Sequence, residues 1–387
     1  MLTQPVLTAL PPLSLYIHIP WCVKKCPYCD FNSHNAPEEL PEQRYVDALE
    51  RDLESALPLI WGRGIHSIFF GGGTPSLFSA AAIDRILAMV RSLVRLEFFA
   101  EVTLEANPGT VEAVKFAEFK SAGVNRLSLG IQSFDAQHLQ ALGRIHGAQE
   151  AHDAIAVAAA SFDNYNLDLM YALPNQTFAQ AQQDLTTAIG YRPPHLSCYH
   201  LTLEPNTPFH SRPPELPDDD LSADMQLMIE GQLGEAGYLH YETSAFALPG
   251  RQARHNLNYW QFGDYLGIGA GAHSKLSFHD RVIRQMRHKH PRAYMEQTLA
   301  GNPVQTESRV EPSALGFEFM MNALRLNQGF PVSLFADRTG LPITALQTQL
   351  KSAEERGLLE RDHLRIAPTP LGRRFLNDLL GLFLPAS

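Results

Sequence analysis

The first half of the chain alternates short runs of β-forming residues with longer helical patterns, and this alternation constrains the fold more than any other feature. Six strand candidates precede residue 204, and segments with apolar residues at helical spacing separate them. Parallel strands need long crossovers, which are usually helices, so this order indicates a parallel sheet. The predicted strands are Leu13–Ile19, Ser67–Phe70, Glu101–Leu104, Arg126–Gly130, Leu167–Met170 and His195–Leu203.

The number of strand–helix units decides whether the sheet closes into a full barrel. A closed eight-fold barrel would need two further strand–helix units, which the sequence does not supply. We therefore expect an α/β fold in which an incomplete (β/α)6 barrel is the main part. The predicted helices are Gln43–Ile60, Ala80–Val94, Val111–Ala122, Ala136–Leu142, Ala148–Ala160 and Phe178–Ile189.

The pattern changes after Leu203. A loop rich in Pro and Asp is followed by a helix at about Leu221–Ala236 and then by short mixed segments. From about Pro312 the chain is mostly helical, with a predicted β-hairpin in Leu358–Ile366 and a final helix after Pro370, an order that resembles a winged helix. We predict an N-terminal tail (1–12), the partial barrel (13–236), a small α+β extension (237–311) and a C-terminal winged-helix-like domain (312–387).

Three of the four cysteines lie in one loop directly after the first predicted strand. Cys22, Cys26 and Cys29 have the spacing C-x3-C-x2-C. Three thiolates in one short loop can bind three irons of a [4Fe–4S] cube, which leaves the fourth iron open for an exchangeable ligand. A zinc site with His34 or Cys198 as fourth ligand is the alternative, although the spacing is not that of paired zinc knuckles.

Several other residues that are suited to binding a ligand lie at or just after the ends of the predicted strands. Because active-site residues of parallel barrels collect at the carboxyl ends of the strands, we expect these side chains to share one rim. A glycine triplet lets the backbone approach a ligand closely, and carboxylates accept hydrogen bonds from ammonium or hydroxyl groups. Taken singly, each could instead be an ordinary turn or a solvated side chain. The set is Gly71, Gly72, Gly73, Thr74, Glu105, Gln132, Arg144 and Asp168, with His18 and Ala172 as further candidates.

The cysteine loop, with Tyr28 before its third cysteine, resembles the signature of the radical S-adenosylmethionine (SAM) superfamily. The resemblance implies a [4Fe–4S] cluster on Cys22, Cys26 and Cys29, with SAM bound at the open iron. The residues it implies for the SAM pocket are Tyr16, Gly72, Gly73, Thr74, Glu105, Gln132, Arg144 and Asp168.

Longer runs narrow the resemblance to the oxygen-independent coproporphyrinogen III oxidase group. They include YIHIPWC, GGGTPS, LEANP, GVNRLSLGIQSF, NLDLMYALP and DYLGIGAGAHS, and they extend from about Tyr16 to Arg325. The oxidase itself has a long N-terminal arm and a further cysteine soon after the triad. Here the first strand begins about a dozen residues in, and Asp30-Phe31-Asn32 follows the triad. These departures, with the runs CDFNSH, HNLNYW and EFMMNALRL, resemble the HemW group of haem chaperones.

The HemW-like runs imply haem as a third ligand and a haem-acceptor protein as partner, together with a reductant protein for the cluster. Haem needs an axial ligand, and histidine is common in that role. His255, in the run HNLNYW with Tyr259 and Trp260 beside it, is our candidate; His273 and His200 are the alternatives. Oxidative decarboxylation of coproporphyrinogen III and a purely structural cluster are the competing hypotheses.

Charge and composition exclude some other roles. A formal net charge of −10 opposes general binding of nucleic acid, and acidic residues interrupt the basic ones in the C-terminal part. We read that part as a lid or docking module. The first twelve residues lack a basic start and an apolar run, and no uncharged stretch is long enough for a membrane span. We expect a cytoplasmic protein.

Overall fold

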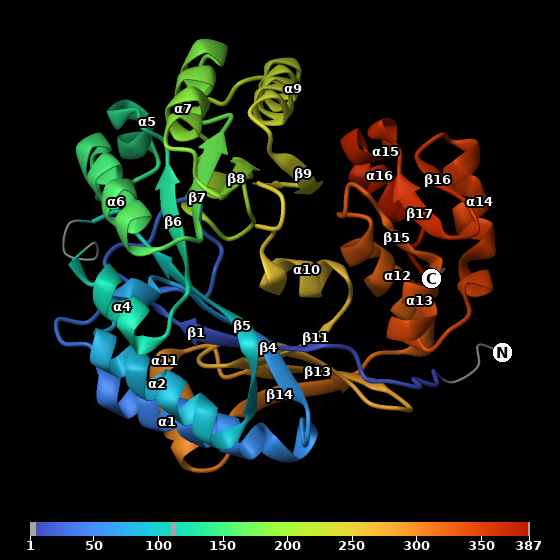
Figure 1. Cartoon of the computed structure of the whole chain (residues 1–387), viewed down its shortest axis with the longest axis horizontal. Coiled ribbons are helices and arrows are strands. Elements are labelled where there is room, and N and C mark those ends of the chain that lie inside the picture. Colours follow the sequence, from blue (N-terminus) through green and yellow to red (C-terminus); the bar gives the residue numbers. More distant parts are fainter. Residues whose placement is uncertain (1–4, 110–113, 386–387) are drawn as a thin grey trace.

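The computed structural model describes residues 5–109 and 114–385, and a twelve-stranded sheet forms its centre. The order of strands across this sheet is β14-β13-β12-β11-β1-β4-β5-β6-β7-β8-β10-β9 (Figure 1). The strands of the parallel part are β1 (Leu13–Ile19), β4 (Gly64–Gly72), β5 (Arg95–Ala106), β6 (Arg126–Gln132), β7 (Tyr165–Tyr171) and β8 (His195–His200). The others are β9 (Leu239–Glu242), β10 (Ala245–Ala247), β11 (Asp264–Ile268), β12 (His273–Ser277), β13 (Val282–Arg287) and β14 (Val304–Arg309).

The six strands predicted from the sequence pair side by side in parallel, which confirms the incomplete barrel. One further strand, β11, also joins β1 in parallel, and the prediction did not include it. The crossover helices cover the outer face of the curved sheet (Figure 1). They are α1 (Glu42–Ala56), α2 (Ala80–Leu93), α4 (Phe116–Ala122), α5 (Ala136–Ala141), α6 (Ala148–Ser161) and α7 (Phe178–Gly190), and α9 (Asp219–Glu235) packs against α7.

Several predicted boundaries were wrong for local reasons. The first helix ends at Ala56 instead of Ile60, because Pro58 lacks a backbone N–H and a 3-10 turn follows. Strand β8 ends at His200 instead of Leu203. Helix α9 begins two residues earlier than predicted, because the Asp218 side chain accepts the N–H of Leu221. The predicted helix Val111–Ala122 falls partly outside the described residues, and its described part ends at Gly123 with φ of 115°.

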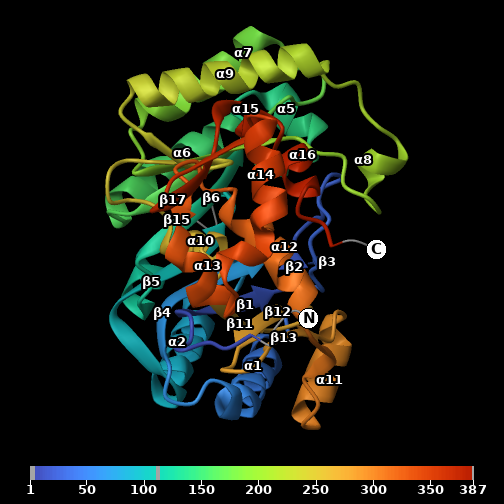
Figure 2. The ribbon, with the colours of Figure 1, turned by 90° about the vertical axis from the view of Figure 1, so that its right-hand side faces the viewer.

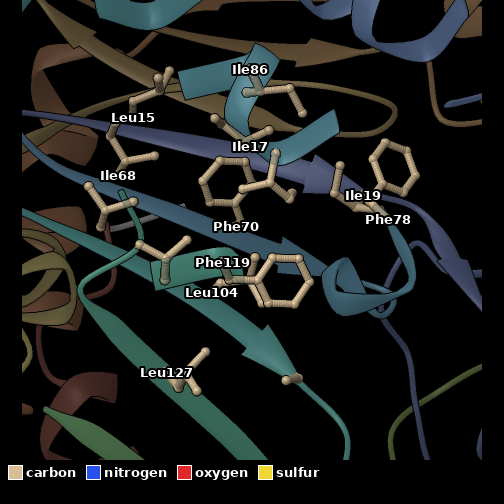
Figure 3. Packing of buried hydrophobic residues seen from close by; sticks show 14 of the residues in the cluster. Leu15, Ile17, Ile19, Ile68, Phe70, Phe78, Ile86, Leu104, Phe119 and Leu127 are labelled. Carbon is tan, nitrogen blue, oxygen red and sulfur yellow. The ribbon is translucent and has the colours of Figure 1, made fainter. Parts of the chain in front are cut away.

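Successive side chains of the parallel strands point to opposite faces of the sheet. One face packs against the helices and forms the hydrophobic core, and the other faces the interior of the barrel. The buried apolar residues of one face point toward the helices, as Figure 3 shows for Leu15, Ile17, Ile68 and Phe70. They pack against Ile86 of α2 and Phe119 of α4, among others. Removing each such side chain from water contributes roughly 1.5–3 kcal/mol. The opposite face carries polar residues, which include Ser14, Ser67, Thr103, Ser128, Asn166 and Ser197.

A short helix, α10 (Arg254–Trp260), lies within the curve of the sheet between the barrel and the C-terminal elements (Figure 1). It contacts β1, β4 and β11. The carboxylate of Glu101 on β5 accepts the backbone N–H groups of Arg254 and His255, each at 3.2 Å. These bonds satisfy two of the free donors at the start of the helix, so Glu101 fixes α10 against the inner face.

The segment after α10 continues the central sheet. Strands β12, β13 and β14 form antiparallel pairs beyond β11, and α11 (Pro291–Leu299) packs against α1. Leu266, Ile268 and Leu276 belong to the same hydrophobic core as β1 and β4. The division of the chain at residues 13, 237 and 312 stays a prediction.

The C-terminal elements surround a second hydrophobic core (Figure 2). Its centre includes Phe319, Phe330 and Phe335, whose rings meet edge to face. The predicted hairpin consists of β16 (Leu359–Arg361) and β17 (Arg365–Pro368), and β15 (Phe330–Pro331) pairs with β17 as a third strand. The winged-helix-like order is therefore confirmed. The helices are α12 (Pro312–Ala323), α13 (Val332–Thr339), α14 (Gln347–Glu355), α15 (Pro370–Arg374) and α16 (Leu376–Gly381). Across residues 5–109 and 114–385, no helix is long and apolar enough to cross a membrane.

Candidate functional site

The cysteine loop and the carboxyl ends of the parallel strands enclose one cavity of about 350 Å³, which we call the cluster cavity. Ten of the residues selected from the sequence line it. They come from separate elements that only the parallel arrangement of the strands brings to one rim. These residues are Cys22, Cys26, Cys29, Gly72, Gly73, Thr74, Glu105, Gln132, Arg144 and Asp168.

The three thiols lie on a partly exposed loop. Two-residue strands, β2 (Trp21–Cys22) and β3 (His34–Asn35), pair in parallel and close its base. Cys26 Sγ is 3.8 Å from the Arg144 guanidinium, and Cys29 Sγ is 3.9 Å from Ser33 Oγ. Burial raises the pKa of the Cys22 and Cys29 thiols, so metal binding has to displace their protons.

The donor set favours a cluster over a single ion. Within the described part of the chain, no group of three or more His, Cys, Asp or Glu side chains is arranged to hold one metal ion. A [4Fe–4S] cube, in contrast, takes each thiolate on a different iron, so its ligands spread around a cavity. Three thiols around one cavity, with no fourth cysteine lining it, fit such a cube with one open iron.

The glycine triplet joins the end of β4 to the cysteine loop. Gly73 N–H donates to the Ile19 carbonyl at 2.8 Å, and Thr74 N–H donates to the Trp21 carbonyl at 2.7 Å. A Cβ on Gly73 would lie 2.5 Å from the Trp21 carbonyl oxygen, and one on Gly72, where φ is 116°, would lie 2.5 Å from the His18 ring. Side chains at these positions would therefore separate the two segments.

Two carboxyl groups face the cavity from neighbouring parts of the rim. Glu105 Oε2 accepts the Gly72 N–H at 3.2 Å, and burial, with a smaller contribution from Asp168, raises the pKa of Glu105 to about 8. Asp168 accepts hydrogen bonds from Ser128 Oγ at 2.9 Å and Asn166 Nδ2 at 2.8 Å, and burial raises its pKa. A cationic ligand would restore ionisation of Glu105.

A hydrogen-bonded chain crosses the floor of the cavity. Arg144 Nη2 donates to Asn107 Oδ1 at 2.6 Å and to the Gly130 carbonyl at 2.8 Å, and Asn107 Nδ2 donates to Thr74 Oγ1 at 2.9 Å. The buried Arg144 Nε has no hydrogen-bond partner among the described residues. Sequence reasoning missed Asn107, although its place in the run LEANP, just after β5, gave a signal.

Gln132 reaches this rim through an irregular backbone. Its φ is 68°, and the register between β6 and β7 shifts between Leu129 and Gln132. Such a bulge redirects a side chain at the end of a strand. Ala172 also has a positive φ, of 55°, but it is buried and does not line the cavity.

Tyr16 and His18 extend from the inner face of β1. His18 Nε2 lies 2.8 Å from the Asn32 carbonyl, which can only accept, so we assign the ring proton to Nε2. His18 Nδ1 then accepts from the Tyr16 hydroxyl at 3.0 Å. Burial lowers the pKa of His18 to about 4, so its ring is neutral at pH 7. Tyr16 lines a neighbouring cavity and not the cluster cavity.

This second cavity, of about 920 Å³, adjoins the first and shares Gly72, Glu105 and Cys29 with it. Strands β1, β11 and β12, the cysteine loop and the loop at Pro205-Asn206 enclose it. Among the side chains that line it are Tyr259, Tyr265, His273 and Lys289, of which sequence reasoning had named Tyr259 and His273.

His255, the candidate haem ligand, lines neither cavity. It is 2% exposed on α10, with its ring against Phe69 at 4.9 Å and its Nδ1 at 3.1 Å from Ser67 Oγ. Its Nε2 is buried without a partner among the described residues. A haem iron could reach this ring only after α10 left the sheet, so its role as ligand stays a prediction. His200 also lies outside both cavities.

The chain matches family models in both of its parts. Residues 16–188 match the Radical SAM superfamily, and residues 310–375 match the HemN C-terminal domain. Two proteins described as heme chaperone HemW, from Escherichia coli K12 and Haemophilus influenzae, are each 50% identical to it. The first alignment covers 97% of this chain and 99% of the relative, and the second covers 97% and 98%.

More distant proteins extend the same comparison. A Bacillus subtilis protein described as heme chaperone HemW is 32% identical, over 96% of this chain and 99% of its own. The structure of coproporphyrinogen III oxidase (HemN) from Escherichia coli, described as a radical SAM enzyme, superposes with a TM-score of 0.82 at 24% identity. That superposition covers 97% of this chain and 90% of the oxidase, so the two proteins share a fold.

Proposed function

Because the chain belongs to the HemW family within the radical SAM superfamily, we propose that it binds a [4Fe–4S] cluster, SAM and haem and passes haem to an acceptor protein. The observation that carries the proposal is the convergence of three cysteines with Gly72, Glu105 and Arg144 around one cavity. The names of the relatives support the haem role. We also propose the cytoplasm as its compartment and a reductant protein as electron donor to the cluster.

Each residue of the cluster cavity has a role in this proposal. Cys22, Cys26 and Cys29 would each hold one iron of the cluster, which leaves the fourth iron without a protein ligand. When bound, the cluster and SAM supply one-electron chemistry that no side chain supplies. Arg144 lines the cavity and is already fixed by Asn107 and Gly130, and its guanidinium would pair with the carboxylate of the methionyl group.

Glu105 receives the ammonium end of the ligand in this proposal. In the empty cavity its Oε2 accepts the Gly72 N–H, and its raised pKa favours the protonated carboxyl group at pH 7. Pairing with an ammonium group would release that proton. Asp168 and Gln132 accept hydrogen bonds from ribose hydroxyls, while Tyr16, Gly73 and Thr74 shape the walls of the pocket.

Oxygen-independent coproporphyrinogen III oxidase is the second candidate function. The shared fold and the intact cluster cavity favour it. The residues after the triad, Asp30-Phe31-Asn32, differ from the oxidase pattern, in which a further cysteine follows. We therefore place the chaperone role first.

One assay separates the two candidates. Cluster-reconstituted protein is incubated anaerobically with SAM, reductant and coproporphyrinogen III, and protoporphyrinogen is followed by chromatography, with a known oxidase active alongside. We expect no product and, in parallel, a shift of the Soret band away from that of free haemin when haemin is added. Stoichiometric or greater product would overturn the chaperone assignment.

A further inference from the structure

We propose that the second cavity is the haem site, with His273 as the axial ligand of the iron and Tyr259 and Tyr265 against the porphyrin face. This inference rests on the proposed haem binding and specifies where it occurs. Its ligand class is a flat iron porphyrin that carries carboxylates.

The size and position of the second cavity suit such a ligand. Its volume of about 920 Å³ is at the upper end of the range for pockets that bind small molecules and cofactors. It adjoins the cluster cavity through Gly72, Glu105 and Cys29, so a bound porphyrin would lie beside the cluster without filling the proposed SAM pocket. Gly271 and Ala272 leave one wall free of large side chains.

His273 is the histidine of this cavity that is free to bind iron. It stands exposed at the start of β12, and its ring makes no hydrogen bond to any residue that the structure describes. Partial burial and the nearby cations Lys289 and Arg284 lower its pKa, so the imidazole is neutral at pH 7 and keeps a lone pair for the metal.

The other two histidines that line the cavity are engaged elsewhere. Both ring nitrogens of His18 are bonded, to Tyr16 and to the Asn32 carbonyl. His34 packs edge-on against His290 at 5.3 Å, and its Nε2 is enclosed by protein. This leaves His273 as the ligand that needs no rearrangement of the fold.

Two tyrosines form a fixed aromatic wall. The rings of Tyr259 and Tyr265 lie 4.5 Å apart, tilted by 52°. Tyr265 OH accepts a hydrogen bond from Arg284 Nη1 at 3.0 Å, and Arg284 is held in turn by Glu318 of α12 at 2.7 Å. Because this wall is already ordered, stacking of a porphyrin on it costs little side-chain entropy.

The charges of the cavity suit a ligand with carboxylates. Lys289 lines it and forms no ion pair within the described ranges. Lys25 Nζ already donates to the Phe31 and Ser33 carbonyls, at 2.9 and 3.3 Å. Two acids, Glu105 and Asp30, also line the cavity, and burial raises the pKa of Glu105 to about 8.

The test is a haemin titration of the full-length, cluster-reconstituted protein, followed by the Soret band. Three variants are compared: His273→Ala, His255→Ala and the matched control His288→Ala. His288 is half-buried and lies outside the cavity, with its Nε2 bonded to the Asn302 carbonyl. We expect only His273→Ala to change the spectrum. It should weaken haemin binding by at least about tenfold, because loss of a group that merely hydrogen-bonds to a metal ligand already costs about that much.

Added imidazole distinguishes a lost ligand from a misfolded protein. In His273→Ala it should restore the wild-type Soret position, because a free ring can occupy the vacated space. A wild-type spectrum in His273→Ala, or a loss confined to His255→Ala, would overturn the inference while leaving haem binding in place. Wild-type protein that leaves the Soret band of free haemin unshifted would instead refute the proposed function.

Discussion

The rim of the barrel and the helix inside it use most of their polar groups in different ways. At the rim, Glu105 retains a raised pKa and Arg144 Nε has no partner among the described residues. At α10, Glu101 caps the helix, and Asn258 Nδ2 bonds both Ser14 Oγ and the Asp264 carbonyl. At the rim, Glu105 and Arg144 line a cavity that a ligand can enter. Helix α10 uses most of its polar groups to hold the fold, although His255 Nε2 and Trp260 Nε1 are buried without partners among the described residues.

Runs of sequence that look equally suggestive of chemistry can therefore have distinct roles: some line a binding cavity, and others hold the fold. Desolvated ionisable groups that line a cavity are candidates for binding a ligand. The run HNLNYW places His255 and Asn258 against the sheet and only Tyr259 toward the second cavity. Variants at the rim and in α10 test this division.

Substitution of a rim cysteine should have the largest effect. Cys26→Ala removes one of the three thiolates, so we expect no stable [4Fe–4S] cluster after anaerobic reconstitution, as measured by bound iron and sulfide. Cys198→Ala is the matched control, because Cys198 is buried on β8 away from the loop. Equal iron content in wild type and Cys26→Ala would refute the assignment of the loop as the cluster site.

Arg144→Lys should weaken SAM binding without preventing cluster assembly. Lysine keeps the charge but loses the forked guanidinium that bonds Asn107 and Gly130 and faces the cavity. Hydrogen bonds to charged groups contribute about 1.5–3 kcal/mol, so we expect about a tenfold to hundredfold increase in the Kd for SAM. Calorimetry on the reconstituted protein measures it, and an unchanged Kd would remove Arg144 from the pocket.

SAM affinity should depend on pH through Glu105. Its pKa in the empty cavity is about 8, so below this pH the side chain must lose a proton before it pairs with an ammonium group. We expect the Kd to rise by up to about tenfold for each pH unit between pH 8 and pH 6. In Glu105→Gln the slope should vanish. A wild-type Kd that stays flat between pH 6 and 8 would contradict the proposed pairing.

His255→Ala should have the smallest effect at the rim. The substitution removes a buried ring and its bond to Ser67, so we expect the free energy of unfolding to fall by about 1–3 kcal/mol. Thermal or denaturant unfolding measures this loss. The Kd for SAM should stay at the wild-type value. A large loss of SAM affinity in a folded His255→Ala protein would show that α10 contributes to SAM binding at the rim.

The sequence predicted the rim well because its signals are local. The cysteine spacing and the residues that follow Ile19, Phe70 and Leu104 depend only on strand direction, and parallel strands carry their ends to one edge. The orientation of α10 was not predictable in this way. Whether His255 faces a cavity or the sheet depends on Glu101 and Ser67, residues more than 150 positions away in the chain.

Long-range contacts explain the other gaps as well. Asn107 reaches Arg144 across 37 positions, and strand β11 joins β1 although more than two hundred residues separate them. The second cavity joins the cysteine loop to β11, β12 and α10, so no single run of sequence could reveal it. Alternation and spacing therefore predicted the barrel and most of the cluster cavity, but not the second cavity.

The most direct test of the account is haem transfer under anaerobic conditions. Cluster-reconstituted protein is loaded with one equivalent of haemin, separated from free haemin and mixed with the apo form of a haem protein whose activity returns on haem uptake. We predict faster recovery of activity than with the same amount of free haemin, together with loss of the Soret band from the donor. Recovery no faster than with free haemin would contradict a chaperone role.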